Sequence, residues 1–120
     1  AIDDELYLLE HTGETIWGPK FAPDFSDMGA PAVADIDADG LAEIIVSSER
    51  RLTVFETDGT VKWTAEIFDD SGVTGATVFD FENDGLYEVV HVDEEDFRIF
   101  DALTGTRLYE TRHTSPTVYE

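Results

Sequence analysis

Two short stretches of this 120-residue chain carry closely spaced acidic side chains that could bind a hard cation. The first runs from Asp35 to Glu43 and reads DIDADGLAE, with carboxylates at loop positions 1, 3, 5 and 9 and a glycine at position 6. Oxygen ligands at this spacing suit a cation of the size of calcium, and glycine allows a sharp turn because it takes positive φ without steric cost. Position 12, a glutamate in an EF-hand loop, is here Val46 within an apolar run. We therefore expect the loop to join two strands rather than two helices.

The second stretch, from Asp80 to Glu88, reads DFENDGLYE and repeats the acid, glycine and leucine positions of the first. Gly40 and Gly85 lie 45 residues apart, a period typical of repeat proteins. Carboxylates crowded in this way repel one another, at a cost of about 3 kcal/mol for a pair about 5 Å apart at an effective dielectric of about 20. We expect a divalent cation at each loop; the alternative is two solvated acidic turns.

Hairpins of a second kind alternate with the acidic loops. Their turns carry Gly13, Gly59 and Gly105, spaced 46 residues apart, and an aromatic residue follows each glycine by four positions, at Trp17, Trp63 and Tyr109. No stretch shows sustained apolar spacing at i, i+3, i+4 and i+7, so we expect almost no helix. One acidic-loop hairpin and one turn hairpin give a four-stranded antiparallel unit of about 45 residues, the size of a β-propeller blade. The aromatic rings are expected to lie between such units.

The chain is therefore predicted to be all-β, a β-propeller segment of about two and a half four-stranded antiparallel blades in one domain, residues 1–120. Its expected parts are a half blade and connector in 1–29, a blade with a calcium loop in 30–74, a second such blade in 75–116, and the start of a further strand in 117–120. Propellers typically have four to eight blades. We expect either a piece of a longer chain or copies that assemble to complete a ring.

The two acidic loops and the apolar residues beside them resemble a known family. The sequences VADIDADGLAEIIV (33–46) and VFDFENDGLYEVV (78–90) are similar to the calcium repeats of FG-GAP/VCBS propellers, including the integrin α-subunit type. Glu82 and Asn83 stand where Asp and Gly are commoner in that family. The resemblance implies two calcium ions, held by the side chains of Asp35, Asp37, Asp39 and Glu43 with the Leu41 carbonyl, and by those of Asp80, Glu82, Asp84 and Glu88 with the Leu86 carbonyl. It also implies an extracellular or cell-surface location.

The composition limits the possible partners. The chain has 28 acidic and 7 basic residues, a formal net charge of −21, and such a field repels nucleic acid, whose binding depends on cationic contacts to phosphate. It has no cysteine, which excludes disulfides, zinc knuckles and iron–sulfur sites. No run of about 18 apolar residues is present, so we expect no membrane span.

No catalytic constellation stands out in the sequence. His11, His91 and His113 are not at metal-ligand spacing, and no serine lies in a GxSxG motif. We therefore predict a non-catalytic module that binds a protein or carbohydrate ligand, as in adhesion, or serves as a structural surface component. Aromatic residues of the connectors, Phe21, Phe25 and Phe68, are candidate ligand contacts, with packing between blades as the alternative.

One enzymatic alternative stays open, namely that the chain is part of a larger propeller enzyme. Eight-bladed rhamnogalacturonan lyases carry acidic loops similar to Asp35–Glu43. Quinoprotein dehydrogenases carry turn hairpins in which a tryptophan follows a glycine by four positions, as at Gly13 and Trp17.

Overall fold

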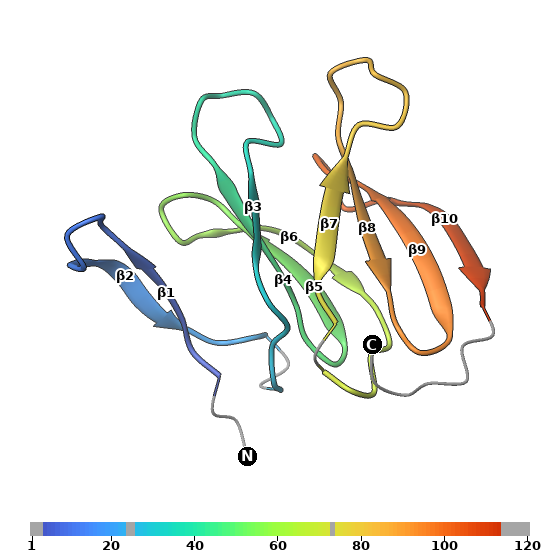
Figure 1. Ribbon diagram of the computed structural model, residues 1–120, viewed down its shortest axis with the longest axis horizontal. Coiled ribbons are helices and arrows are strands. Elements are labelled where there is room, and N and C mark those ends of the chain that lie inside the picture. Colours follow the sequence, from blue (N-terminus) through green and yellow to red (C-terminus); the bar gives the residue numbers. More distant parts are fainter. Residues whose placement is uncertain (1–3, 24–25, 73, 114–120) are drawn as a thin grey trace.

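Ten strands make up three antiparallel sheets in the computed structural model, which describes residues 4–23, 26–72 and 74–113 (Figure 1). The first sheet contains β1 (Leu6–Leu9) and β2 (Thr15–Lys20). The second contains β3 (Ala32–Ala34), β4 (Glu43–Ser47), β5 (Arg51–Phe55) and β6 (Val61–Glu66). The third contains β7 (Ala76–Phe79), β8 (Glu88–Val92), β9 (Asp96–Asp101) and β10 (Arg107–Arg112). In these ranges no residue is helical, and accordingly no helix has the length and apolar character needed to cross a membrane.

Each four-stranded sheet is a meander in which consecutive strands are neighbours. The three sheets stand side by side like the ribs of a fan, with β3 and β7 next to each other near the centre of the view (Figure 1). The molecule is correspondingly flat, with extents of 43 × 41 × 20 Å.

Strand β4 is buried along its whole length because both of its faces are covered by a neighbouring sheet. Ile44 and Val46 point toward the first sheet, where Leu6 and Trp17 pack against them. Ile45, between them in sequence, belongs to the cluster that also contains residues of the third sheet. Successive side chains of a strand point to opposite faces, so the continuous apolar run of β4 serves two interfaces at once.

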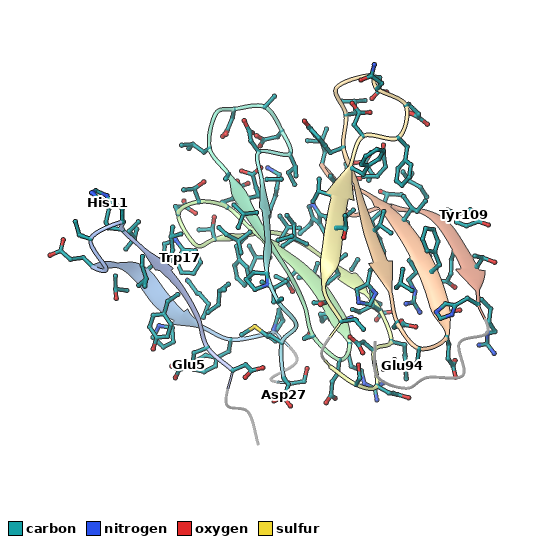
Figure 2. All side chains as sticks on the ribbon, in the orientation of Figure 1. Glu5, His11, Trp17, Asp27, Glu94 and Tyr109 are labelled. Carbon is teal, nitrogen blue, oxygen red and sulfur yellow. The ribbon has the colours of Figure 1, made fainter. Side chains whose placement is uncertain are left out.

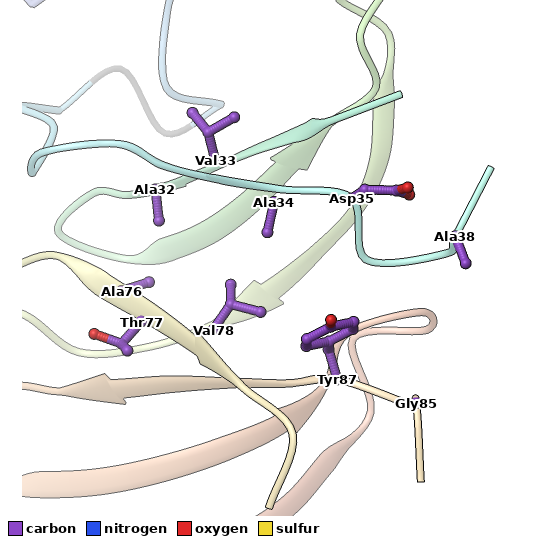
Figure 3. Close-up of a pocket in the computed structure, with 10 residues that line it drawn as sticks. All are labelled: Ala32, Val33, Ala34, Asp35, Ala38, Ala76, Thr77, Val78, Gly85 and Tyr87. Atoms are coloured by element: carbon purple, nitrogen blue, oxygen red, sulfur yellow. The ribbon is translucent and has the colours of Figure 1, made fainter. Parts of the chain in front are cut away.

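Small side chains line the facing surfaces of β3 and β7. Ala32, Ala34 and Ala76 lie along a cleft between these two strands, together with Val78 (Figure 3). Because alanine side chains are small, β3 and β7 can approach each other closely. The gap between the second and third sheets is therefore narrow at these two strands, which are the first strands of their sheets. The outermost strand, β10, is instead fully exposed and carries charged residues, as is common for edge strands.

A tryptophan joins each sheet to the next. The Trp17 Nε1–H of the first sheet donates a hydrogen bond to the Thr57 carbonyl of the second, at 2.7 Å. Trp63 of the second sheet makes the same contact with the Ala102 carbonyl of the third, also at 2.7 Å. The two rings thus lie between sheets, as the sequence predicted, whereas Tyr109 is half exposed and contacts Phe97 of its own sheet (Figure 2).

The glycine turns allow these contacts. A Cβ added to Gly105 would lie 2.5 Å from Trp63 Cε3, and one added to Gly59 would lie 3.1 Å from the Trp17 ring. Both glycines also have positive φ, of +76° and +87°. Gly13 has the same kind of conformation, with φ of +92°, but an added Cβ there would meet nothing within 4 Å. The repeated glycines and tryptophans therefore have a packing role, because the turn glycine of one hairpin leaves room for the indole of the preceding sheet.

The all-β, antiparallel, four-stranded organisation predicted from the sequence is confirmed. The described residues do not form a closed ring. The further strand predicted at 117–120 lies outside the described residues.

Candidate metal centre

The two acidic loops occupy equivalent places at the same end of neighbouring sheets (Figure 1). Residues 35–42 connect β3 to β4 and residues 80–87 connect β7 to β8. The last strand pair before each loop joins Ala34 to Glu43 in one sheet and Phe79 to Glu88 in the other. The prediction that these loops join two strands is confirmed.

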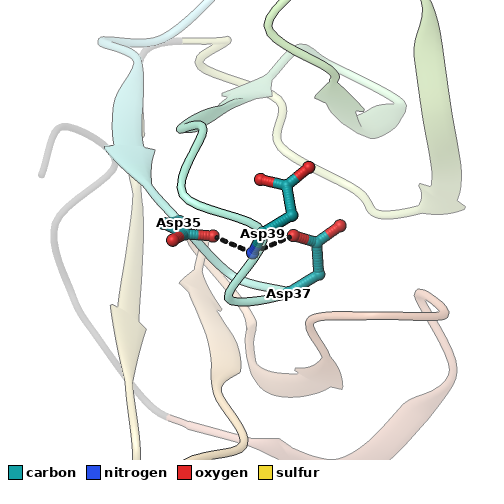
Figure 4. A group of neighbouring side chains, drawn as sticks. All are labelled: Asp35, Asp37 and Asp39. Atoms are coloured by element: carbon teal, nitrogen blue, oxygen red, sulfur yellow. Dashed lines mark hydrogen bonds between the residues drawn. The ribbon is translucent and has the colours of Figure 1, made fainter.

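In the first loop, aspartate carboxylates turn the backbone inward by accepting its amide protons (Figure 4). Asp35 accepts from the N–H groups of Asp39 at 3.1 Å and Gly40 at 3.0 Å. Asp37 Oδ1 accepts from the Asp39 N–H at 3.1 Å, and Asp39 Oδ1 accepts from the Leu41 N–H at 2.7 Å. One carboxylate oxygen from each of the three aspartates lies within 4.8 Å of the others, a spacing that allows a shared cation.

The second loop repeats most of these bonds. Asp80 accepts from the N–H groups of Asp84 at 3.1 Å and Gly85 at 2.8 Å, and Asp84 Oδ1 accepts from the Leu86 N–H at 2.9 Å. The amide donors, led by Gly85, hold the pKa of Asp80 below its ordinary value. Carboxylate oxygens of this loop do not gather as closely: none of the described groups of three within 4.8 Å includes Asp80, Glu82, Asp84 or Glu88.

Two residues of each loop adopt left-handed backbone conformations. Gly40 and Gly85, at position 6, have φ of +91° and +85°, which confirms the turn predicted there. Position 4 is also left-handed, with φ of +62° at Ala38 and +55° at Asn83. Asn adopts this conformation more readily than Ala.

Glu43 lies beneath the first loop with no solvent exposure. Its Oε2 accepts from the Ile36 N–H at 2.8 Å, and its Oε1 is buried without any hydrogen-bond partner among the described residues. Burial raises the pKa of Glu43, and the nearby carboxylates of Asp37 and Glu56 raise it further. A buried carboxylate oxygen is costly unless a cation or a donor meets it. The donor set at Asp35, Asp37, Asp39 and Glu43 therefore fits a hard divalent cation. In the second loop Glu88 similarly accepts from the Phe81 N–H at 3.1 Å.

Glu56 and Lys62, two residues of the β5–β6 hairpin that the sequence reasoning missed, also face the first loop. Carboxylate oxygens of Glu56, Asp37 and Glu43 lie within 4.8 Å of one another. The Lys62 Nζ lies 2.8 Å from Asp37 Oδ2 and 2.9 Å from Glu56 Oε1. These bonds raise the pKa of Lys62, and the bond from Lys62 lowers the pKa of Asp37. Only the packing of the hairpin against the loop brings these groups together, so spacing along the chain gave no signal for them.

The predicted carbonyl ligands belong to residues whose side chains point away. Leu41 and Leu86 have more than half of their surface exposed, so any contribution they make to a cation comes from the backbone. Their role as ligands stays a prediction. The connector aromatics Phe21 and Phe68 are exposed, with the Arg50 guanidinium 4.5 Å from the Phe68 ring centre, and Phe25 lies outside the described residues.

A buried polar network stands apart from the loops, beneath the connector that enters β7. The Thr74 hydroxyl donates to Asp69, so His91 Nε2, 3.0 Å from the same hydroxyl, must carry a proton and donate to it. His91 is fully buried and its Nδ1 has no partner among the described residues. Burial lowers the pKa of His91. Nearby, Arg98 is held by Asp93 and by two further carboxylates. The network suits a structural role in anchoring the connector.

Comparison with known proteins gives a family model that matches the two acidic loops. Residues 35–91, which span both acidic loops and the hairpin between them, match the model of the FG-GAP-like repeat. Over these residues the chain is similar to an FG-GAP-like repeat. The matched segment begins at the first acidic loop, at Asp35, and ends in β8, at His91.

One solved structure is similar in fold to part of the chain. The crystal structure of the V. cholerae biofilm matrix protein Bap1 matches with a TM-score of 0.58 and 26% sequence identity over 63% of this chain. The chain spans only 13% of the length of that protein. No curated protein sequence matches the chain.

Proposed function

We propose that this chain is a calcium-stabilised segment of an extracellular β-propeller, with a structural or ligand-binding role rather than a catalytic one. The observation that carries the proposal is Glu43 Oε1, a fully buried carboxylate oxygen with no partner among the described residues, beneath three clustered aspartates. Bound calcium would supply the positive charge that this cluster needs. Asp35, Asp37, Asp39, Glu43 and the Leu41 carbonyl would hold it in the first loop.

The second loop is proposed to bind a second calcium ion through Asp80, Glu82, Asp84, Glu88 and the Leu86 carbonyl. Its support is the matching set of amide-to-carboxylate bonds. We expect weaker binding there, because the oxygens gather less closely and Glu82 must fold its longer side chain back to reach the position taken by Asp37 in the first loop.

A thermal melt in calcium and in a chelator tests the proposal. For a site with a Kd of about 1 mM, about 10 mM calcium contributes about 1.4 kcal/mol to folding, which raises the Tm by about 5 °C. Sodium chloride at equal ionic strength is the necessary control, because screening alone stabilises a chain with a net charge of −21. Identical melting curves in calcium and in the salt control would exclude the proposal.

A pair of variants locates the effect. Asp39→Asn keeps an oxygen for the Leu41 N–H but removes a charge, and should abolish the calcium-dependent part of the shift that belongs to the first loop. Glu14→Gln removes an equal charge from the exposed turn of the first sheet and should leave the calcium shift unchanged.

The extracellular location and the structural role are inferred from one comparison and one expected property of the loops. Bap1 is described as a biofilm matrix protein. Calcium sites of extracellular modules have a Kd of about 10⁻⁴–10⁻³ M, so a loop of that class would fill only at the millimolar concentrations outside cells. The partner would be a protein or a carbohydrate. Secretion in the native source, followed by surface proteolysis or antibody labelling, tests the location; retention in the cytoplasm would contradict it.

The outer faces of the first and third sheets are proposed to pack against further blades. The ring of Tyr109 stands where Trp17 and Trp63 contact the next sheet, and Gly13 has the open space that Gly59 and Gly105 fill with an indole. Light scattering distinguishes the possible sources of the missing blades. A Tyr109-dependent oligomer would identify other copies of the chain, and a monomer would assign them to flanking polypeptide.

A further inference from the structure

Lys62 is a cation already present at the first loop. Its Nζ is bonded to Asp37 Oδ2 and Glu56 Oε1, and only 17% of its side chain is exposed. The Asp37 Oδ1 accepts from the Asp39 N–H, and Lys62 holds the other oxygen of that carboxylate. An incoming divalent cation and the ammonium group therefore compete for the same carboxylate.

We propose that Lys62 is a built-in competitor that sets the calcium affinity of the first loop, and that Glu56 receives its ammonium group when calcium takes Asp37. The inference rests on the proposed calcium function and goes beyond it by naming the residue that tunes one site and not the other. With Lys62 in place the loop has a counter-ion in the absence of metal, so it keeps its shape, at the cost of weaker calcium binding.

The geometry allows calcium to displace Lys62 from Asp37, so Lys62 does not block the site permanently. Lys62 has two acceptors, and Glu56 belongs to its own hairpin and lies outside the DIDADGLAE loop. The side chain can therefore lose Asp37 and keep Glu56. The hairpin itself stays attached to the loop, because the Thr57 hydroxyl donates to the Ala42 carbonyl at 2.7 Å independently of Lys62.

The second loop provides an internal comparison. The residue that follows Gly105 by three positions, as Lys62 follows Gly59, is Leu108, which is exposed and cannot compete for a cation. The proposed competition is therefore confined to the first loop.

The test is a calcium titration followed by amide NMR, because each loop contains a glycine whose N–H is bonded to an aspartate of that loop. Gly40 donates to Asp35 Oδ2 and Gly85 donates to Asp80 Oδ2, so their two cross-peaks report the two sites separately. The variants are Lys62→Met, which removes the charge and keeps the apolar stem, and Lys62→Arg, which keeps the charge. Lys20→Met is the matched control, since it removes one positive charge from a lysine that lies over the Trp17 ring and beside Gly59.

In Lys62→Met the calcium midpoint at Gly40 should fall about tenfold, equivalent to about 1.4 kcal/mol, while that at Gly85 stays unchanged. Lys62→Arg should remain close to the native protein at both glycines, and Lys20→Met should move neither by more than twofold. A Gly40 midpoint that is the same in Lys62→Met and Lys20→Met overturns the inference but leaves the calcium function intact. Absence of any calcium response at both glycines in every variant overturns both. A Gly40 response seen only in Lys62→Met would support the competition and would show that the first loop of the native protein does not bind calcium.

Discussion

Replacing Gly105 by alanine tests whether the turn glycine is needed for the Trp63 indole to pack between consecutive sheets. The new Cβ would lie 2.5 Å from Trp63 Cε3, a distance at which the indole must move away from its position between the sheets. The backbone there has φ of +76°, which alanine adopts at a cost of about 1–2 kcal/mol. Displacing a buried, hydrogen-bonded indole adds about 1–3 kcal/mol, as for other overpacked cores.

The expected loss is therefore about 2–5 kcal/mol of the free energy of unfolding. Gly13→Ala is the matched control, because its φ is also positive, at +92°, but no atom lies within 4 Å of the added Cβ. That variant should lose no more than the backbone cost of about 1–2 kcal/mol. Gly59→Ala, 3.1 Å from the Trp17 ring, should fall between the two.

Urea unfolding followed by tryptophan fluorescence measures these differences, with unchanged m-values as the condition for comparing midpoints. A double-mutant cycle with Trp63→Leu isolates the contact. In that background Gly105→Ala should cost only the backbone strain. Equal losses of stability in Gly105→Ala and Gly13→Ala would refute the proposed packing role of Gly105. So would an undiminished loss for Gly105→Ala in the Trp63→Leu background.

Three further predictions concern the loops and the buried network. Because burial lowers the pKa of His91, the unfolded chain binds the proton more tightly; stability should be complete above about pH 6.5 and fall below it by at most about 1.4 kcal/mol per pH unit, a slope absent in His91→Gln. Ala38→Gly should relieve the left-handed strain and raise stability by up to about 1 kcal/mol, and Asn83→Gly by less, both measured by urea unfolding. Arg98→Met should cost about 3–5 kcal/mol, because it leaves the fully buried Asp93 without its cation; a loss below about 1 kcal/mol would mean that the ion pair is dispensable.

Much of the architecture followed from local patterns. The spacing of acids and glycine in the two loops, and the apolar runs beside them, predicted loops between strands, and the 46-residue interval between turn glycines predicted repeated hairpins. These features are readable because strand alternation, positive φ at glycine and carboxylate acceptance of nearby amides depend on residues a few positions apart.

Other features depend on contacts between distant segments and were decided only by the tertiary structure. Lys62 and Glu56 meet Asp37 because the β5–β6 hairpin packs against the loop, and no regular spacing along the chain indicates this. The two faces of β4 likewise became distinguishable only when a sheet covered each of them. The sequence by itself thus determined the strands, the turns and the acidic loops, because their causes are local. The tertiary structure alone decided which charge stands beside which carboxylate, because electrostatic interactions act through space and not along the chain.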